Sequence, residues 1–248
     1  MNRNLTDSII ALHAGHIYKR LFRRHPSERQ QDHLIIYHRL LRNLTKAGYG
    51  TLIEVGPGDR SILAVAVRCL NKKLKYVAIE ADISSATNLS LALNSNGHSC
   101  KIINSPFLEW LGSKDQTDDN IVLCFDHSLE DMLIRSLGLT IFGIQEWDDI
   151  IYGLSSLPAE LANNTFIYNH LELIHKSLLD FQAIKRPKSN YLLIHHYISH
   201  IYTPKSFLSN LDMVVFNYIK SNLCSHADKY NRIISGKMDE DLFWIGRL

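Results

Sequence analysis

The sequence predicts an α/β fold in which a mostly parallel sheet carries helices on both faces. From residue 50 onward, short apolar runs alternate with segments that have the apolar spacing of helices. This alternation is typical of parallel strands joined by helical crossovers. Residues 122–125 are apolar throughout, as expected for a strand covered on both sides. A chain of 248 residues is long enough for one such domain with a helical extension.

The expected elements follow the chain in order. Strands are expected at residues 51–55, 75–80, 100–104 and 120–125, with helices at 62–70 and 84–94 between the first three. The second half is less regular, with helices expected at 128–138, 158–179 and 204–222 and a fifth strand at 191–197. Residues 232–235 and 241–247 indicate two further strands joined by a turn, and an antiparallel hairpin of this kind is common on a mixed sheet.

The region before the first strand is expected to be helical. Residues 5–47 have helical apolar spacing, interrupted at Pro26, which can begin a second helix. Basic residues gather between positions 19 and 24, where positive charge suits the C-terminus of the first helix. We therefore expect an N-terminal helical cap over residues 1–47 and the main domain over residues 48–248.

Composition excludes several classes of protein. A formal net charge of +2, from 27 basic and 25 acidic residues, gives no reason to expect bulk binding to nucleic acid. The 4 cysteines lie far apart with no CxxC pair, which disfavours a disulfide scaffold or a cysteine zinc site and fits a reducing compartment. No apolar run reaches ~18 residues, and no signal-like apolar core is seen at the N-terminus. We expect a cytoplasmic protein without a membrane partner.

A glycine turn follows the first predicted strand and is the most informative feature of the chain. The strand ends in an acid, Glu54, and the loop that follows it has glycines at positions 56 and 58. Glycines let a ligand approach the backbone closely, and the helix after the turn directs free N–H groups at that ligand. Glu80 ends the second strand, where a carboxylate can accept hydrogen bonds from ribose hydroxyls. The alternative is a turn with an acid that serves only as a cap.

This pair of motifs resembles the class I S-adenosylmethionine-dependent methyltransferases. The acid-x-Gly-x-Gly turn of that family is matched by Glu54, Gly56 and Gly58, and its acid at the end of strand two by Glu80. The resemblance implies a Rossmann-like sheet of seven strands with an antiparallel seventh, in agreement with the expected hairpin. It covers roughly residues 48–248, and S-adenosylmethionine is the cofactor that it implies.

The resemblance also implies roles for single residues. The loop residues Gly56, Pro57, Gly58 and Asp59 would meet the methionine end and the ribose of the cofactor. Glu54 would organise the turn and the cofactor amine, Glu80 would bind the ribose hydroxyls, and Ala81 would lie near the adenine. These positions are read directly from the matched motifs.

One part of the family pattern is missing. Many members have an acid at the end of strand three that meets the adenine amino group, whereas this chain has Asn104, Ser105 and Pro106 there. Asn104 or Ser105 can still offer a hydrogen bond to the adenine, and the ring of Phe107 can lie on it. The departure affects the expected adenine contacts more than the ribose contacts.

Strand four ends in Asp126 and His127, which in the family would face the methyl group and the acceptor. A carboxylate with an imidazole can act as a general base on an acceptor hydroxyl or amine. The alternative is that Asp126 or Ser128 caps the next helix. No metal site is expected, because histidine pairs such as His195 and His200 are five residues apart and do not share a helix face.

The sequence therefore favours a methyltransferase that moves a methyl group to O or N of a small-molecule or peptide acceptor. An NAD(P)-dependent oxidoreductase is the first alternative, although Ser61 stands where its third glycine would fall. A non-catalytic binding subunit with the same fold is the second. The acceptor and the oligomeric state stay open, and a homodimer through the N-terminal helices is one option.

Overall fold

The computed structural model divides into two compact units, Met1–Leu123 and Cys124–Leu248, and each is described by itself. The structure describes the following residues: 5–70, 74–94, 100–112, 120–126, 128–129, 132, 164–184, 191–199, 218, 221–222, 234–236 and 239–247.

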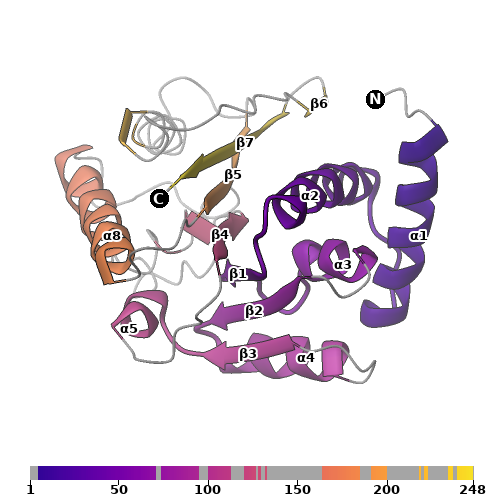
Figure 1. The fold of residues 1–248 in the computed structure, drawn as a ribbon, viewed down its shortest axis with the longest axis horizontal. Helices are drawn as coiled ribbons and strands as arrows, with labels where there is room; N and C mark the ends of the chain where they lie inside the picture. Colours follow the sequence, from indigo (N-terminus) through magenta and orange to yellow (C-terminus); the bar gives the residue numbers. More distant parts are fainter. Residues whose placement is uncertain are drawn as a thin grey trace, which may run out of the picture. The chain divides into compact units, whose positions relative to one another are not determined.

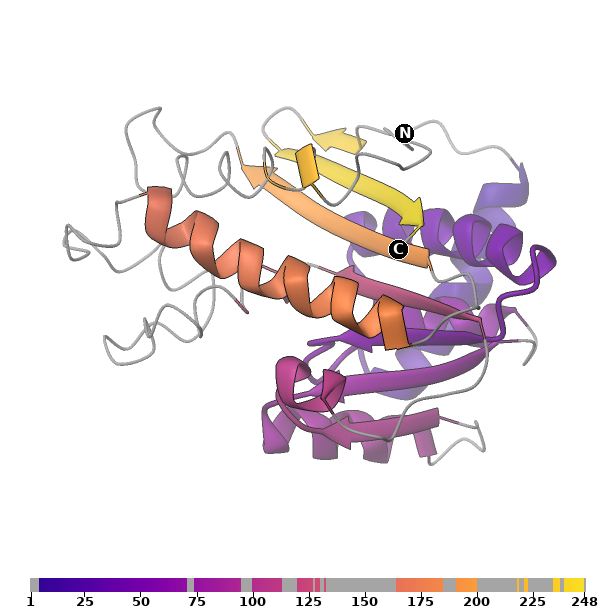
Figure 2. The ribbon, with the colours of Figure 1, turned by 60° about the vertical axis from the view of Figure 1, so that its left-hand side comes forward.

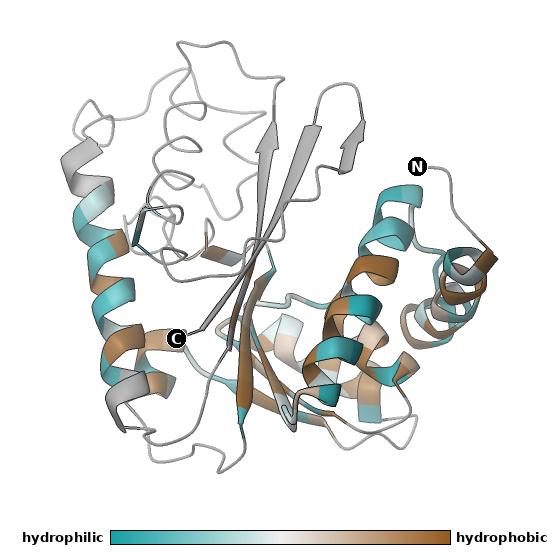
Figure 3. Cartoon of the chain, turned by 45° about the horizontal axis from the view of Figure 1, so that its top comes forward, coloured by the Kyte–Doolittle hydropathy of each residue, from teal (hydrophilic) through white to brown (hydrophobic). Residues whose placement is uncertain are grey.

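The first unit is built on three parallel strands, β1 (Thr51–Val55), β2 (Lys75–Glu80) and β3 (Cys100–Asn104), with β2 in the middle (Figure 1). Every residue of β1 is buried, and in β2 only the first is exposed. Both strands have apolar residues at their centres, Leu52 and Ile53 in β1 and Val77 to Ile79 in β2, as expected for strands buried on both faces; Figure 3 colours the described part of the chain by hydropathy. Their carboxyl ends lie at one edge of the sheet, because parallel strands all run in the same direction.

Five helices accompany these strands among the described residues. They are α1 (Leu5–Phe22), α2 (Glu28–Lys46), α3 (Ile62–Cys69), α4 (Ile83–Asn94) and α5 (Phe107–Leu111). Helices α1, α2 and α3 contact one another, and α4 contacts β2 and β3.

The two N-terminal helices are joined by polar as well as apolar contacts. Helix α1 buries Ala11, Ala14, Tyr18 and Leu21, a spacing that places all four on one face. The Arg39 guanidinium of α2 donates to the carboxylate of Asp7, which is buried on α1. A buried carboxylate needs such a partner, because its charge has left water.

The second unit contains a long helix and an antiparallel set of strands. Helix α8 spans Asn164–Ile184. Strand β5 (Tyr191–Ser199) pairs antiparallel with β7 (Asp239–Arg247), which also pairs antiparallel with β6 (Ile234–Gly236), and Figure 2 shows β5 and β7 side by side. Strand β4 (Ile121–Asp126) contributes residues on both sides of the division between the units.

The predicted class, an α/β fold with a parallel sheet and helices, is confirmed. Strands β1, β2 and β3 have the predicted bounds, β4 begins and ends one residue later than predicted, and β5 is two residues longer. The helices predicted at 128–138 and 204–222 lie almost entirely outside the described residues. The division at residue 47 stays a prediction. Among the helices that the structure describes, none has the length and apolar character needed to cross a membrane.

Helix α2 begins with a reciprocal cap that can be tested. The Ser27 hydroxyl accepts a hydrogen bond from the Gln30 N–H at 3.2 Å, and the Gln30 side chain accepts one from the Ser27 N–H at 2.9 Å. Ser27→Ala should lower the free energy of unfolding by about 1 kcal/mol, because the Gln30 N–H loses its side-chain acceptor. Urea denaturation measures the change. Ser84→Ala, at an exposed position of α4, is the control, and an equal loss in both variants would contradict the prediction.

Candidate functional site

The loop after β1 has a backbone conformation that favours glycine. Both Gly56 and Gly58 have a φ of 65°, in the left-handed region that glycine adopts without steric cost. The Gly56 N–H donates to the Ile79 carbonyl at 2.8 Å, which holds the start of the loop against β2. A Cβ built on Gly58 would meet no atom within 4 Å. The loop therefore has open space beside its second glycine.

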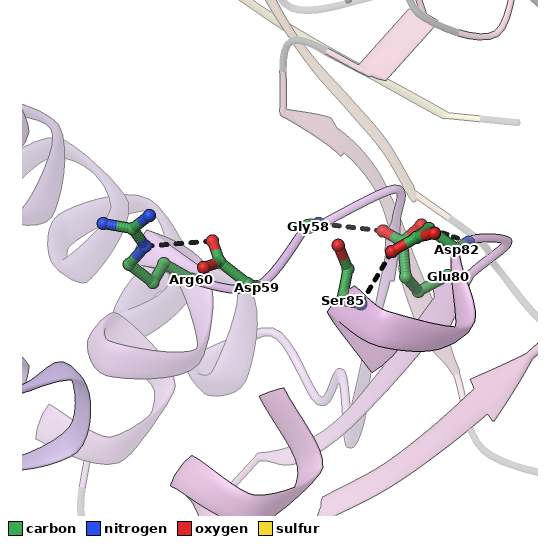
Figure 4. A network of polar contacts seen from close by, with 6 residues as sticks. All are labelled: Gly58, Asp59, Arg60, Glu80, Asp82 and Ser85. Atoms are coloured by element: carbon green, nitrogen blue, oxygen red, sulfur yellow. Dashed lines mark hydrogen bonds and ion pairs between the residues drawn. The ribbon is translucent and has the colours of Figure 1, made fainter. Parts of the chain in front are cut away.

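The Glu80 carboxylate joins this loop to the end of β2 (Figure 4). One oxygen accepts a hydrogen bond from the Gly58 N–H at 2.8 Å, and the other accepts one from the Asp82 N–H at 2.8 Å. Asp82 in turn accepts a hydrogen bond from the Ser85 N–H at 2.7 Å, at the start of α4. The Glu80 side chain is only 5% exposed. Its position is therefore fixed by backbone groups on two sides.

A second buried carboxylate, Glu54, lies at the end of β1 and is only 1% exposed. One of its oxygens, Oε2, accepts hydrogen bonds from the hydroxyls of Ser61 and Tyr76, each at 2.5 Å. The Ser61 hydroxyl also accepts a hydrogen bond from the Ala64 N–H at 2.8 Å, and this bond caps α3. Sequence reasoning assigned no role to Ser61 or Tyr76 in this network.

Hydrogen bonds join the end of β3 to the end of β2. The Asn104 side-chain amide donates to the carbonyls of Glu80 at 2.9 Å and Ala81 at 3.1 Å. The Ser105 N–H also donates to the Glu80 carbonyl, at 3.1 Å. Phe107 is 5% exposed and stacks on Trp110, with ring centroids 6.1 Å apart.

Most of the predicted site residues therefore belong to one edge of the first unit. Glu54, Glu80 and Asn104 lie at or next to the carboxyl ends of three neighbouring strands. The remaining ones in this unit follow those strand ends directly: Gly56, Pro57, Gly58, Asp59, Ala81, Ser105 and Pro106.

Three further observations complete the outcome for the predicted residues. Asp126 is half-buried at the end of β4, within the second unit, and His127 lies outside the described residues. The Asp59 carboxylate pairs with Arg60 at 2.9 Å, and this hydrogen bond is the main reason why the pKa of Arg60 is raised. Within the described part of the chain, no group of three or more His, Cys, Asp or Glu side chains is arranged to hold a metal ion.

The backbone conformation of Gly58 gives a direct test of the loop. Gly58→Ala should lower the free energy of unfolding by about 1 kcal/mol, because an L-residue is strained at this φ while the added methyl group has room. Gly112→Ala is the matched control, since Gly112 has a φ of −75° and its Cβ would make only ordinary contacts. Equal stabilities of the two variants in urea would contradict the assigned loop conformation.

Comparison with known proteins shows the fold but no close relative. No protein-family model matches the sequence, and no curated protein matches it. The crystal structure of cofactor-bound Rv0187 from MTB is similar with a TM-score of 0.51 and 10% identity, over 99% of this chain and 90% of that one. The delta-N METTL16 MTase domain is similar with a TM-score of 0.50 and 11% identity, over 97% of each chain.

A third solved structure is the mitomycin 7-O-methyltransferase MmcR, with a TM-score of 0.43 and 13% identity over 88% of this chain. The chain spans 56% of the length of that protein. The two structures with TM-scores of 0.51 and 0.50, one cofactor-bound and the other a methyltransferase domain, show that the chain shares their fold.

Proposed function

We propose that the chain is a class I S-adenosylmethionine-dependent methyltransferase that methylates O or N of a small-molecule or peptide acceptor. The observation that carries the proposal is the Glu80 carboxylate, which is buried and bonded to the N–H groups of Gly58 and Asp82. This places a fixed anion beside a glycine loop at the carboxyl ends of parallel strands. Ligands of open α/β sheets bind at that edge.

The residues present fit the ribose and the methionine part of the cofactor. Each Glu80 oxygen accepts a backbone hydrogen bond, and a carboxylate oxygen has a second lone pair that can accept from a ribose hydroxyl. The open space beside Gly58 lets a ligand lie against the backbone. We assign the loop residues 56–59 to the methionine end and ribose, and Glu54 to the organisation of this loop.

We assign to Asn104 the hydrogen bond with the adenine amino group that an acid makes in many members of the family. Its amide group donates to the carbonyls of Glu80 and Ala81, and these two bonds fix which way the amide is turned. The oxygen of that amide is then the atom that can meet a ligand, and a carbonyl oxygen only accepts hydrogen bonds. A purine with an amino group matches this requirement. Ala81, Ser105 and Pro106 are proposed to line the same part of the site.

The acceptor side of the site is proposed from the end of β4. When bound, S-adenosylmethionine would supply an activated methyl group, whose carbon bonds to an acceptor O or N as its bond to sulfur breaks and S-adenosylhomocysteine is left. Asp126 and His127 are assigned to hold the acceptor and to remove a proton from it where the acceptor must lose one. Alignment of the two reactants can supply much of the acceleration by itself. A general base is therefore an addition to positioning and not a replacement for it.

The finer predictions about architecture belong to the same proposal. The predicted architecture is a mostly parallel sheet of seven strands with an antiparallel terminal hairpin, and residues 1–47 form a helical cap on a domain of residues 48–248. The parallel pairings of β1 with β2 and of β2 with β3, and the antiparallel pairing of β5 with β7, support this prediction. A cytoplasmic location and a homodimer through the N-terminal helices stay predictions.

Calorimetric titration tests the function. The chain should bind S-adenosylmethionine and S-adenosylhomocysteine and not NADH. Glu80→Ala should weaken S-adenosylhomocysteine by more than about 1.4 kcal/mol, a factor of ten, because the ribose hydroxyls lose a charged acceptor. Glu109→Ala, at an exposed position of α5, should leave the dissociation constant unchanged.

The remaining outcomes of the titration identify the alternatives. Heat with NADH alone would support an oxidoreductase, and no heat with any of the three ligands would support a non-catalytic subunit. An unchanged dissociation constant in Glu80→Ala would show that the ribose lies elsewhere.

The role of Asn104 is tested by ligand discrimination. Asn104→Ala should weaken S-adenosylhomocysteine several-fold, about 1 kcal/mol, because the adenine amino group loses its acceptor. The variant should also discriminate less between S-adenosylhomocysteine and S-inosylhomocysteine, which has an oxygen in place of that amino group. Asn94→Ala is the control, since the exposed Asn94 amide bonds to the Ser90 hydroxyl and the Cys100 thiol, at the amino end of β3 and away from the predicted site. Discrimination that is the same in wild type and Asn104→Ala would refute the assignment.

A further inference from the structure

We infer that Tyr76 and Ser61 are positioning residues for the methionine end of the cofactor, and that both act through the Glu54 carboxylate. The inference rests on the proposed function and adds two residues to its site. Neither residue is part of the glycine turn or of the acid that ends β2. The inference is drawn from the network of hydrogen bonds around Glu54 Oε2.

The pairing of the strands brings Tyr76 to Glu54. In the register of β1 and β2, Leu52 lies opposite Tyr76 and Glu54 lies opposite Ala78. Alternate residues of a strand point to the same face, so Leu52, Glu54 and Tyr76 share one face of the sheet. The long tyrosine side chain reaches diagonally along this face, and its hydroxyl donates to Glu54 Oε2 at 2.5 Å. The Tyr76 side chain of the neighbouring strand therefore holds the Glu54 carboxylate in place.

Ser61 holds the same oxygen from the side of α3. Its hydroxyl accepts from the Ala64 N–H at 2.8 Å and lies 2.5 Å from Glu54 Oε2. A hydroxyl has one proton, so that proton must be donated to the carboxylate. Ser61 therefore connects the first turn of α3 to the acid at the end of β1, on the two sides of the glycine loop.

The consequence is a carboxylate that is buried, oriented and stabilised as an anion. Glu54 and Ser61 are each 1% exposed and Tyr76 is 4% exposed. Hydrogen bonds to a charged acceptor are stronger than neutral ones, and a buried anion without donors would be costly. An anion held in one place beside the glycine loop favours the cationic amino group of the cofactor's methionine part. Orientation by Tyr76 and Ser61 is therefore expected to affect that end of the ligand selectively.

The experiment compares two ligands that differ at that end. S-Adenosylhomocysteine contains the amino-acid part, and 5′-methylthioadenosine contains the adenosine and the sulfur without it. Tyr76→Phe removes only the hydroxyl and should weaken S-adenosylhomocysteine about tenfold, while the affinity for 5′-methylthioadenosine changes less than about twofold. Tyr37→Phe, which removes the hydroxyl of a fully buried tyrosine on α2, should change neither affinity.

Two further variants keep the inference testable if Tyr76→Phe folds poorly. Ser61→Ala should show the same selective loss, and Ser61→Thr, which keeps the hydroxyl, should restore the affinity for S-adenosylhomocysteine. In Glu54→Gln, adding Tyr76→Phe should cost less than it does in the wild type, because both changes act on one group.

The possible results separate the inference from the proposed function. Equal weakening of both ligands by Tyr76→Phe or Ser61→Ala would mean that the network only stabilises the fold, and would overturn the inference. Wild-type affinity for S-adenosylhomocysteine in folded variants would also overturn it, while the proposed function would stand. If the wild-type chain binds neither ligand, the proposed function itself is refuted.

Discussion

The bond between the Glu80 carboxylate and the Gly58 N–H, at 2.8 Å, is the interaction on which the site depends. It joins residues that are 22 positions apart and connects the loop after β1 to the tip of β2. It also requires Gly58 to turn its N–H toward β2, which the left-handed φ of 65° permits. An L-residue at this position would be strained by its backbone conformation, although its Cβ would not clash with a neighbouring atom.

Two buried carboxylates serve this edge of the sheet in different ways. Glu80 is satisfied by backbone N–H groups on either side, so its environment is set by the path of the chain. Glu54 is satisfied by the hydroxyls of Ser61 and Tyr76, so its environment is set by side chains. Burial makes hydrogen-bond donors necessary in both cases. Glu80 and Gly58 of the first arrangement belong to the predicted motifs, whereas the second arrangement needs two residues that no motif names.

The strands were the most predictable elements, and the reason is physical. Strands β1 and β2 are buried almost throughout, so their central residues are apolar and each strand is bounded by polar or glycine residues. The first strand and its glycine turn could be placed to the residue. Element ends depend on capping bonds, which explains why α4 begins at Ile83, one residue before the predicted start, where Asp82 accepts the Ser85 N–H.

By itself, the sequence determined the α/β class, the bounds of the first three strands and the group of residues at their carboxyl ends, because these follow from apolar spacing and from glycine and acid positions along the chain. Only the tertiary structure decided what the acids bond to. The parallel register of β1 and β2 brings Tyr76 to Glu54, and the pairing of β2 with β3 brings Asn104 to the Glu80 and Ala81 carbonyls. Contacts of this kind join residues more than twenty positions apart, and a linear pattern holds no information about register.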